Sequence, residues 1–145
     1  GTELVELDDI DVSEDPVRPE LTLGFRIMHG RKIFGLKYND EIEAIVCVAL
    51  CPEIPYTVRE MDYMSQAANQ DGQRGEIVIA YTVWSRKRGA GREIISKLRE
   101  WSIERNFKRL VTLSPLTTMA THFHISNGAK QIHINGETQN FEYKL

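Results

Sequence analysis

The stretch from Glu76 to Pro115 constrains the fold of this chain more than any other part of the sequence. Strand-forming residues run over Ile77–Tyr81, a basic turn follows, and apolar residues then recur at helical spacing from Ile94 to Trp101. Leu110–Leu113 is a second apolar run that predicts a buried strand. A strand, a helix and a strand of this combined length form a right-handed crossover between parallel strands. The stretch therefore predicts an α/β fold.

The turn inside this unit has the chemistry of an anion-binding site. Its residues are Arg86, Lys87, Arg88, Gly89, Ala90, Gly91 and Arg92. The first turn of a helix has unpaired N–H groups and carries partial positive charge, and glycine lets the backbone approach a ligand closely. Because the basic side chains add full charges around those donors, we expect a ligand that carries phosphate.

The spacing of this turn is also a family signature. Arg86-x-x-Gly89-x-Gly91 matches the Arg/Gln-x-x-Gly-x-Gly/Ala pattern with which the GNAT N-acyltransferase superfamily holds the pyrophosphate of coenzyme A. The chain has neither the phosphate loop of nucleoside triphosphatases nor the Gly-x-Gly-x-x-Gly of dinucleotide sites. The turn therefore resembles that of a coenzyme A site.

A second segment, nearer the C-terminus, extends the match. The family carries there a segment of the form Asn-x-x-Ala-x-x-Leu-Tyr-x-x-x-Gly-Phe, and Gly128 aligns on its glycine. Ala120 and Phe123 agree with it in kind, whereas three positions depart from it, namely Thr117, His124 and Ala129. The chain thus resembles the GNAT superfamily from Glu76 to about His133, and its N-terminal half agrees in the order of its elements.

The resemblance implies a mixed β-sheet with helices on both faces, in a single domain that spans residues 1–145. The remaining patterns fit this order: strands are expected over Leu4–Ile10, Lys32–Tyr38, Ile42–Leu50, Gln131–Ile134 and Asn140–Lys144, and helices over Pro19–His29, Val58–Ala68 and Thr117–Ser126. Asn39-Asp40 and Asn135-Gly136 predict tight turns between strands. The stretch Cys51–Arg74 is either a wall of the acceptor site or a surface insertion.

The same resemblance implies the transfer of an acyl group, with acetyl the first choice, from coenzyme A to a primary amine of a small molecule or a protein. Acetyl-CoA is then the co-substrate, no metal takes part, and a homodimer is common among such enzymes. The pantetheine arm is expected along the main chain of one strand and the pyrophosphate over the turn. The residues expected to contact the cofactor are Tyr81, Thr82, Val83, Arg86, Arg88, Gly89, Ala90, Gly91, Arg92, Thr117 and Phe123.

Two catalytic groups follow from the alignment. The tyrosine that many family members use to protonate the departing thiolate maps onto His124, and imidazole can serve the same purpose near neutral pH. Glu76 is the candidate base that would leave the amine neutral, with Glu41 and Glu43 as secondary candidates. The alternatives are a structural histidine on a mixed helix face and glutamates that are merely solvated.

A second reaction also matches the sequence. Thr112-Leu-Ser114-Pro115 resembles the Leu-Ser-Pro element of malonyl-CoA decarboxylases, which contain a GNAT-like catalytic domain. Those enzymes stabilise an enolate with a hydroxyl residue and a histidine, which Thr112, Ser114 and His124 (or His133) could supply here. The Ile-Pro-Gly-Phe that typically follows in those enzymes is absent. A third possibility is a GNAT-fold protein that binds an acyl-CoA without turnover.

The composition sets limits on partners. The 145 residues carry a net charge of −3, which gives no general attraction to nucleic acid or to an anionic membrane. Acidic residues between Glu3 and Asp15 are expected to form a solvated face. With no apolar run long enough to span a bilayer and no signal peptide, we expect a cytoplasmic protein. Cys47 and Cys51 are too few for a zinc site and are expected to be small buried hydrophobic residues.

Overall fold

A computed structural model describes residues 1–145 and contains an eight-stranded sheet with helices on both faces. The strands are β1 (Glu3–Leu7), β2 (Arg31–Tyr38), β3 (Glu41–Cys51), β4 (Ile77–Ser85), β5 (Arg109–Thr112), β6 (Ser114–Pro115), β7 (Lys130–Ile134) and β8 (Thr138–Tyr143). The helices are α1 (Leu23–Ile27), α2 (Val58–Ala68), α3 (Ala90–Glu104) and α4 (Thr118–Ser126), with a short 3-10 helix over Val12–Glu14. The predicted mixed sheet is confirmed.

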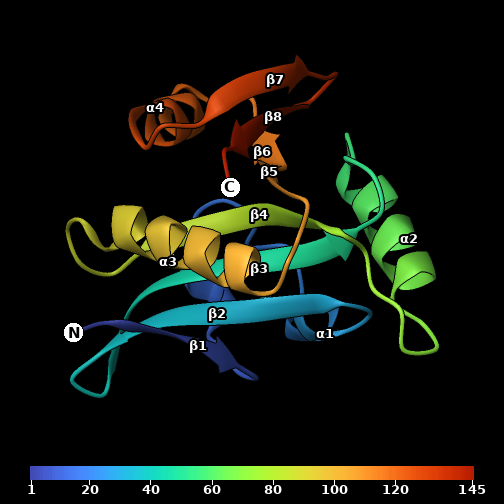
Figure 1. Ribbon diagram of the computed structural model, residues 1–145. Coiled ribbons are helices and arrows are strands. Elements are labelled where there is room, and N and C mark those ends of the chain that lie inside the picture. Colours follow the sequence, from blue (N-terminus) through green and yellow to red (C-terminus); the bar gives the residue numbers. More distant parts are fainter.

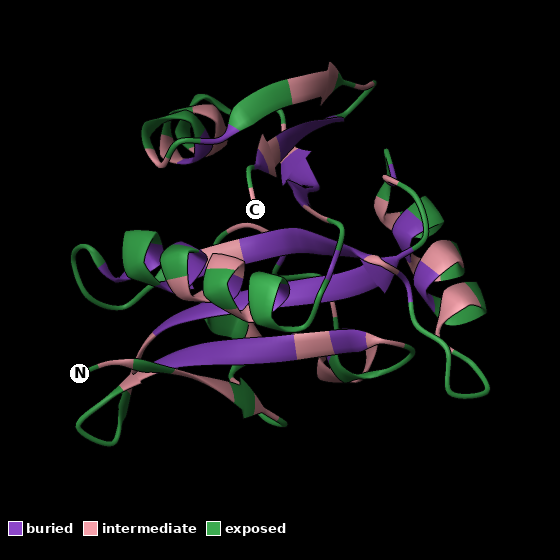
Figure 2. Ribbon diagram, in the orientation of Figure 1, coloured by how far each residue is buried: buried purple, intermediate pink, exposed green.

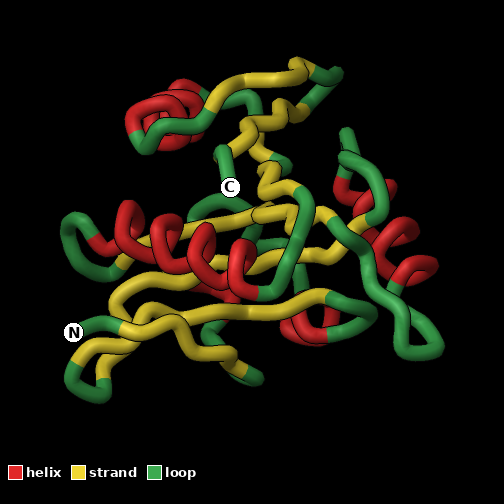
Figure 3. The backbone as a smooth tube through the Cα atoms, viewed as in Figure 1, coloured by secondary structure: helices red, strands yellow, loops and turns green.

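The sheet has the strand order β1-β2-β3-β4-β5-β8-β6, and β7 pairs with β8 at its far side (Figures 1 and 3). Only β4 and β5 run parallel, as the crossover through α3 requires. Asn39 and Asp40 both have positive φ, 49° and 65°, which suits the tight turn predicted between β2 and β3. In Figure 1, α4, β7 and β8 stand apart from β2, β3 and β4, and β5 connects the two groups.

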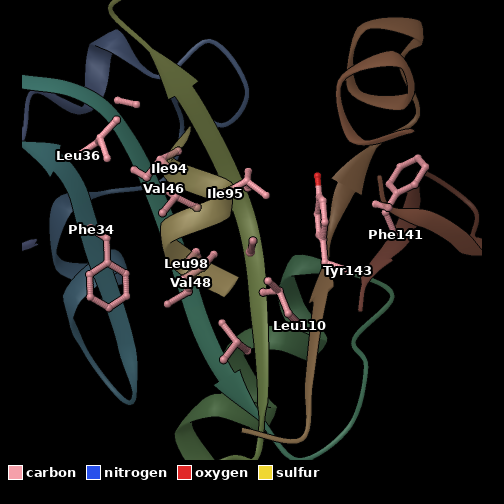
Figure 4. Packing of buried hydrophobic residues seen from close by; sticks show 14 of the residues in the cluster. Phe34, Leu36, Val46, Val48, Ile94, Ile95, Leu98, Leu110, Phe141 and Tyr143 are labelled. Carbon is pink, nitrogen blue, oxygen red and sulfur yellow. The ribbon is translucent and has the colours of Figure 1, made fainter. Parts of the chain in front are cut away.

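Each face of the sheet buries its own apolar cluster. The side of α3 that faces the sheet carries Ile94, Ile95 and Leu98, which pack on Val46 and Val48 of β3 (Figure 4). Each such side chain contributes about 1.5–3 kcal/mol when it is fully buried. The other face is covered by α1, α2 and the loops around them. Figure 2 shows β3 buried along most of its length, whereas α3 turns its outer side to solvent.

Strand β4 contains a bulge that decides what its residues face. Thr82 pairs with Cys47 and Ala80 pairs with Val48, so that Tyr81 is an extra residue without an opposite partner. Tyr81 packs in the cluster on the α2 side, as Ile77 and Ile79 do, and after the bulge Val83 lies against the cluster on the α3 side. Strict alternation would have placed both side chains on one face.

Three predicted boundaries are wrong at the N-terminal half and at β4. The helix expected over Pro19–His29 is limited to Leu23–Ile27, because Thr22 caps it and Met28 is already extended. The first strand ends at Leu7 instead of Ile10. The strand expected over Ile77–Tyr81 continues to Ser85, since the bulge hides its periodicity.

The cysteines and the helix over Val58–Ala68 are as expected. Cys47 and Cys51 are free and fully buried, and burial raises the pKa of each thiol to about 12, so that both stay protonated. None of the four helices combines the length and the apolar character that a membrane span needs. No three side chains of His, Cys, Asp or Glu come together as they would around a metal ion.

Candidate functional site

The parallel strands β4 and β5 pair over only four residues each and then separate. Ala80 and Thr112 form the last pair, and the N–H of Leu113 donates to the carbonyl of Ala80 just beyond it. Strand β4 continues to Ser85, while the chain after β5 turns away to pair with β8. The edge of β4 that faces β5 therefore has no strand partner from Tyr81 onward, and we call the point of separation the fork.

The end of β4 leads into a helix start that has no side-chain cap. Gly89, the N-cap residue of α3, has φ of +82°, and no side chain bonds to the first turn. Of the five backbone N–H groups from Arg88 to Arg92, only that of Ala90 has a hydrogen-bond partner in the protein. The other four, those of Arg88, Gly89, Gly91 and Arg92, are unpaired. Helices α1, α2 and α4 each start with a threonine whose hydroxyl accepts a bond from the first turn. The start of α3 is thus the one with free donors.

The basic side chains of this turn divide into two pairs. Arg86 makes a two-pronged ion pair with Glu14, with Nη2 2.8 Å from the carboxylate. Lys87 binds Glu41 and Glu43. Arg88 and Arg92 are exposed and form no ion pair. The cations that remain free for an anion are therefore Arg88 and Arg92, whereas Arg86 holds the 3-10 helix against the turn.

Two further residues expected at the cofactor lie beside this turn. The ring of Phe123 lies so close to Gly91 that a Cβ at that glycine would be 3.1 Å from it, a tight contact that the ring would relieve only by shifting. Thr117 is exposed, and its hydroxyl is the cap of α4, where it accepts from the N–H of Ala120. The structure thus brings Phe123 to the turn and assigns the Thr117 hydroxyl to the helix.

His124 points inward from α4 and is 5% exposed. Its Nδ1 lies 2.7 Å from the hydroxyl of Tyr143, and its ring stacks on Phe141. Burial lowers the pKa of His124 to about 4, so that the imidazole is neutral at pH 7. His122, two residues earlier, is exposed. Nε2, the other ring nitrogen, has no hydrogen-bond partner in the protein.

The hydroxyls of Thr112 and Ser114 form a buried pair at the fork. Their oxygens are 2.8 Å apart, and both residues are almost fully buried. The Thr112 hydroxyl also accepts from the N–H of Phe141, the residue on which the ring of His124 stacks. Thr112 and His124 thus both contact Phe141 of β8, and Ser114 is linked to them through the hydroxyl of Thr112.

The proposed bases are not part of this group. Glu76 lies at the start of β4, half-exposed, with its carboxylate 3.6 Å from Arg74 and no hydrogen bond or ion pair to a residue of the fork. Glu41 and Glu43 hold Lys87. His133 lines an open cleft of about 520 Å³, between β7 and the stretch before α2, where its ring meets Tyr56 edge-on. The stretch Cys51–Arg74 therefore forms a wall of that cleft.

One polar network at the fork had no counterpart in the sequence analysis. Asp15 was expected on a solvated face, which is wrong: it is fully buried against β4. Its carboxylate accepts from the Thr82 hydroxyl and pairs with Arg26 at 2.7 Å. Arg18, also buried, donates to the carbonyls of Tyr81 and Leu113. The sequence shows only that Arg18 and Arg26 follow Asp15 in the same short segment. No periodic pattern there predicts that these side chains are buried or which strand they contact.

No family model and no curated protein sequence matches this chain. Solved structures do match it along its whole length. An acetyltransferase from Bacillus subtilis in complex with CoA has a TM-score of 0.66 at 8% identity, covering 100% of this chain and 99% of that one. A GNAT family acetyltransferase from Elizabethkingia anophelis with acetyl-CoA bound has a TM-score of 0.57 at 12% identity, with 97% and 94% covered.

This chain has the GNAT fold. The likeness extends to a malonyl-CoA decarboxylase from Cupriavidus metallidurans, with a TM-score of 0.56 at 20% identity over 86% of this chain. The match covers only 33% of that enzyme, so this chain corresponds to about a third of it. The unpaired edge of β4 leads along the chain from the fork to the uncapped start of α3.

Proposed function

We propose that this protein binds a coenzyme A thioester, with the diphosphate over the start of α3 and the pantetheine arm along the free edge of β4. The observation that carries this is the set of four unpaired N–H groups from Arg88 to Arg92, which follow directly on an unpaired strand edge. Such donors at a helix start favour a phosphate group. Arg88 and Arg92 add two unpaired positive charges beside them.

The first candidate reaction is transfer of an acetyl group to a primary amine of a small molecule or a protein. Holding the thioester at the fork and the amine beside it removes most of the entropic barrier. His124 is neutral and, when Tyr143 donates to its Nδ1, carries its proton on Nε2. That N–H would donate to the departing sulfur. Glu76 remains the proposed base, acting through water because no contact brings it to the fork.

The second candidate is decarboxylation of a malonyl thioester, and a specific observation favours it. Thr112 and Ser114 place two bonded hydroxyls at the fork together with a neutral histidine, and no carboxylate that could act as a base is bonded to them. A decarboxylation needs a stabilised enolate and no amine base. Among the structures compared above, the decarboxylase also has the highest identity, 20% against 8% and 12%.

The experiment that separates these reactions measures binding first and products second. Thermal unfolding is followed with coenzyme A, acetyl-CoA, malonyl-CoA, ATP and NAD in parallel. A ligand at about a hundred times its dissociation constant adds about 2.7 kcal/mol to the free energy of unfolding, which raises the melting temperature by several degrees. We expect a shift with the coenzyme A compounds alone. No shift with any of them would contradict the proposal.

Product analysis then decides the reaction. Incubation with acetyl-CoA and a panel of primary amines yields free coenzyme A and an N-acetyl product if the protein is a transferase. Malonyl-CoA alone yields acetyl-CoA and carbon dioxide if it is a decarboxylase. Ser114→Ala should stop the second reaction while coenzyme A binding persists. Binding without either product would identify a protein that holds acyl-CoA without turnover.

A further inference from the structure

The side chain of Arg18 reaches the fork between β4 and β5. The residue is 8% exposed, its Nε donates to the carbonyl of Tyr81 at 2.8 Å, and its Nη2 donates to the carbonyl of Leu113 at 3.0 Å. These two carbonyls belong to the residues that follow the last hydrogen-bonded pair of the two strands, Ala80 and Thr112. The guanidinium therefore bridges the strands where their own ladder stops.

The positive charge of Arg18 has no partner in the protein. No carboxylate lies within 4.0 Å of it. The two acidic residues whose charges act on it are Glu20 and Asp15. Glu20 is exposed and forms no ion pair with Arg18, and Asp15 is paired with Arg26 through Oδ2, while its Oδ1 accepts from Thr82 and two backbone N–H groups. Burial lowers the pKa of Arg18, yet a guanidinium stays protonated in proteins. A buried, unpaired cation is costly unless a ligand supplies negative charge.

The guanidinium also has a free donor. An arginine offers five N–H groups, and the bonds to Tyr81 and Leu113 use only Nε and Nη2. Nη1 makes no hydrogen bond within the protein, and it is not among the buried atoms that lack a partner, so it still reaches solvent. A ligand that approaches Arg18 from solvent would therefore find a donor without a protein partner.

We propose that Arg18 is the residue that stabilises the negative charge on the carbonyl oxygen of the bound thioester. This rests on the proposed function, since it needs an acyl-CoA on the free edge of β4. In acyl transfer, the amine lone pair forms a bond to the carbonyl carbon and the C=O electron pair moves onto oxygen. That pair then returns, the C–S bond breaks, and the thiolate takes up the proton that the amine loses.

In decarboxylation the same oxygen becomes charged. The electron pair of the bond to the carboxyl carbon moves into the bond beside the carbonyl, carbon dioxide leaves, and the C=O pair moves onto oxygen to give the enolate. The enolate carbon then takes a proton and yields acetyl-CoA. Because Arg18 lies at the fork before the reaction, its charge is compensated only as the oxygen becomes negative, which lowers the barrier in either reaction.

A pair of inert analogues tests the charge recognition without turnover. S-carboxymethyl-CoA and S-carbamoylmethyl-CoA have nearly the same shape and differ in the charge near the sulfur. We expect the wild-type protein to bind the carboxylate at least about tenfold more tightly than the amide, because hydrogen bonds to charged groups are the strong ones. Arg18→Gln should remove this preference and leave the affinity for the amide within about threefold.

Two further variants distinguish stabilisation of charge by Arg18 from a purely structural role of this residue. Arg18→Lys keeps the charge but cannot bridge both carbonyls, so it should retain part of the preference even if Arg18→Gln does not fold. Arg88→Gln removes one of the two unpaired cations of the turn and should weaken both analogues by the same factor. Once turnover is known, Arg18→Gln should reduce kcat at least about hundredfold with little change in coenzyme A affinity.

The outcomes are distinguishable. Equal binding of both analogues by the wild-type protein, or a wild-type kcat in Arg18→Gln, would overturn the role of Arg18 and leave coenzyme A binding intact. Absence of binding of either analogue to the wild-type protein would overturn the proposed function and this inference with it. A preference that Arg18→Gln loses and Arg18→Lys partly keeps would support both.

Discussion

Helices α3 and α4 both follow strands that leave the same sheet, yet they begin in opposite ways. Thr117 caps α4 with its hydroxyl, whereas Gly89 starts α3 in a left-handed conformation with no cap. Conversely, α4 buries His124 against β8, while the exposed residues at the start of α3 offer mainly backbone donors and charge. Under the proposed function, the backbone at the start of α3 would bind the diphosphate of the cofactor, and a side chain of α4 would take part in the chemistry.

The strongest way to break this comparison is to place a negative charge at the start of α3. Gly89→Asp sets a carboxylate beside the unpaired N–H groups, where it would repel a diphosphate. We expect the dissociation constant for coenzyme A to rise at least about hundredfold, measured by calorimetry.

Gly89→Asn is the matched control, because asparagine has nearly the shape of aspartate and a similar tolerance of the left-handed conformation, without the charge. Nothing lies within 4 Å of a Cβ at this position, so neither substitution causes a clash. Equal losses of affinity in the two variants would show that backbone shape, and not charge, governs the site.

The contribution of α4 is tested by His124→Gln. Glutamine still offers Tyr143 a hydrogen bond but cannot take part in proton transfer, so we expect kcat to fall about hundredfold with coenzyme A affinity nearly unchanged. His122→Gln, on the exposed side of the same helix, should behave as the wild type. A fully active His124→Gln variant would make His124 a structural residue.

The burial of His124 also predicts how stability depends on pH. In the unfolded chain a histidine takes up a proton near pH 6.5, but native His124 resists protonation down to about pH 4. The unfolded state thus binds more protons as the pH falls, and the free energy of unfolding decreases by about 2.5 kcal/mol between pH 7 and pH 4.5 from this group. Urea unfolding of the wild type and of His124→Gln at both pH values should show this loss only in the wild type.

The smallest effect concerns the caps. Thr57→Ala and Thr117→Ala each remove the threonine cap of one helix, α2 and α4, and should lower the free energy of unfolding by about 1 kcal/mol. Because the Thr117 hydroxyl is committed to Ala120, we expect neither variant to change coenzyme A affinity by more than about twofold. A selective loss in Thr117→Ala would instead add Thr117 to the cofactor site, as the resemblance implies.

The C-terminal half of the fold was predictable because its signals are local. The crossover from β4 through α3 to β5 follows from two apolar strands and one amphipathic helix. The turn between β4 and α3 is recognisable in the sequence because two glycines lie among basic residues. One helix of the N-terminal half, Val58–Ala68, was also predicted to the residue, and its start is local too, because Thr57 caps it and Glu60 bonds back to the N–H of Tyr56.

The N-terminal half was less predictable because it depends on distant contacts. The segment before α1 has no periodic pattern, and its shape comes from Asp15, Arg18 and Arg26, which bury their charges against β4. The sequence also did not predict that β4 extends to Ser85, since the bulge at Tyr81 interrupts the alternation on which strand prediction depends.

The candidate site divides in the same manner. Residue order along the chain is enough to bring Gly89, Gly91 and the arginines to one turn, because a helix start assembles from neighbours. The order of residues does not predict which cation is paired with a carboxylate. Arg86 forms an ion pair with Glu14, 72 residues away in the chain, whereas Arg88 forms none. Likewise, folding alone puts Arg18 between Tyr81 and Leu113, since charge pairing and burial are properties of residues that meet only in three dimensions.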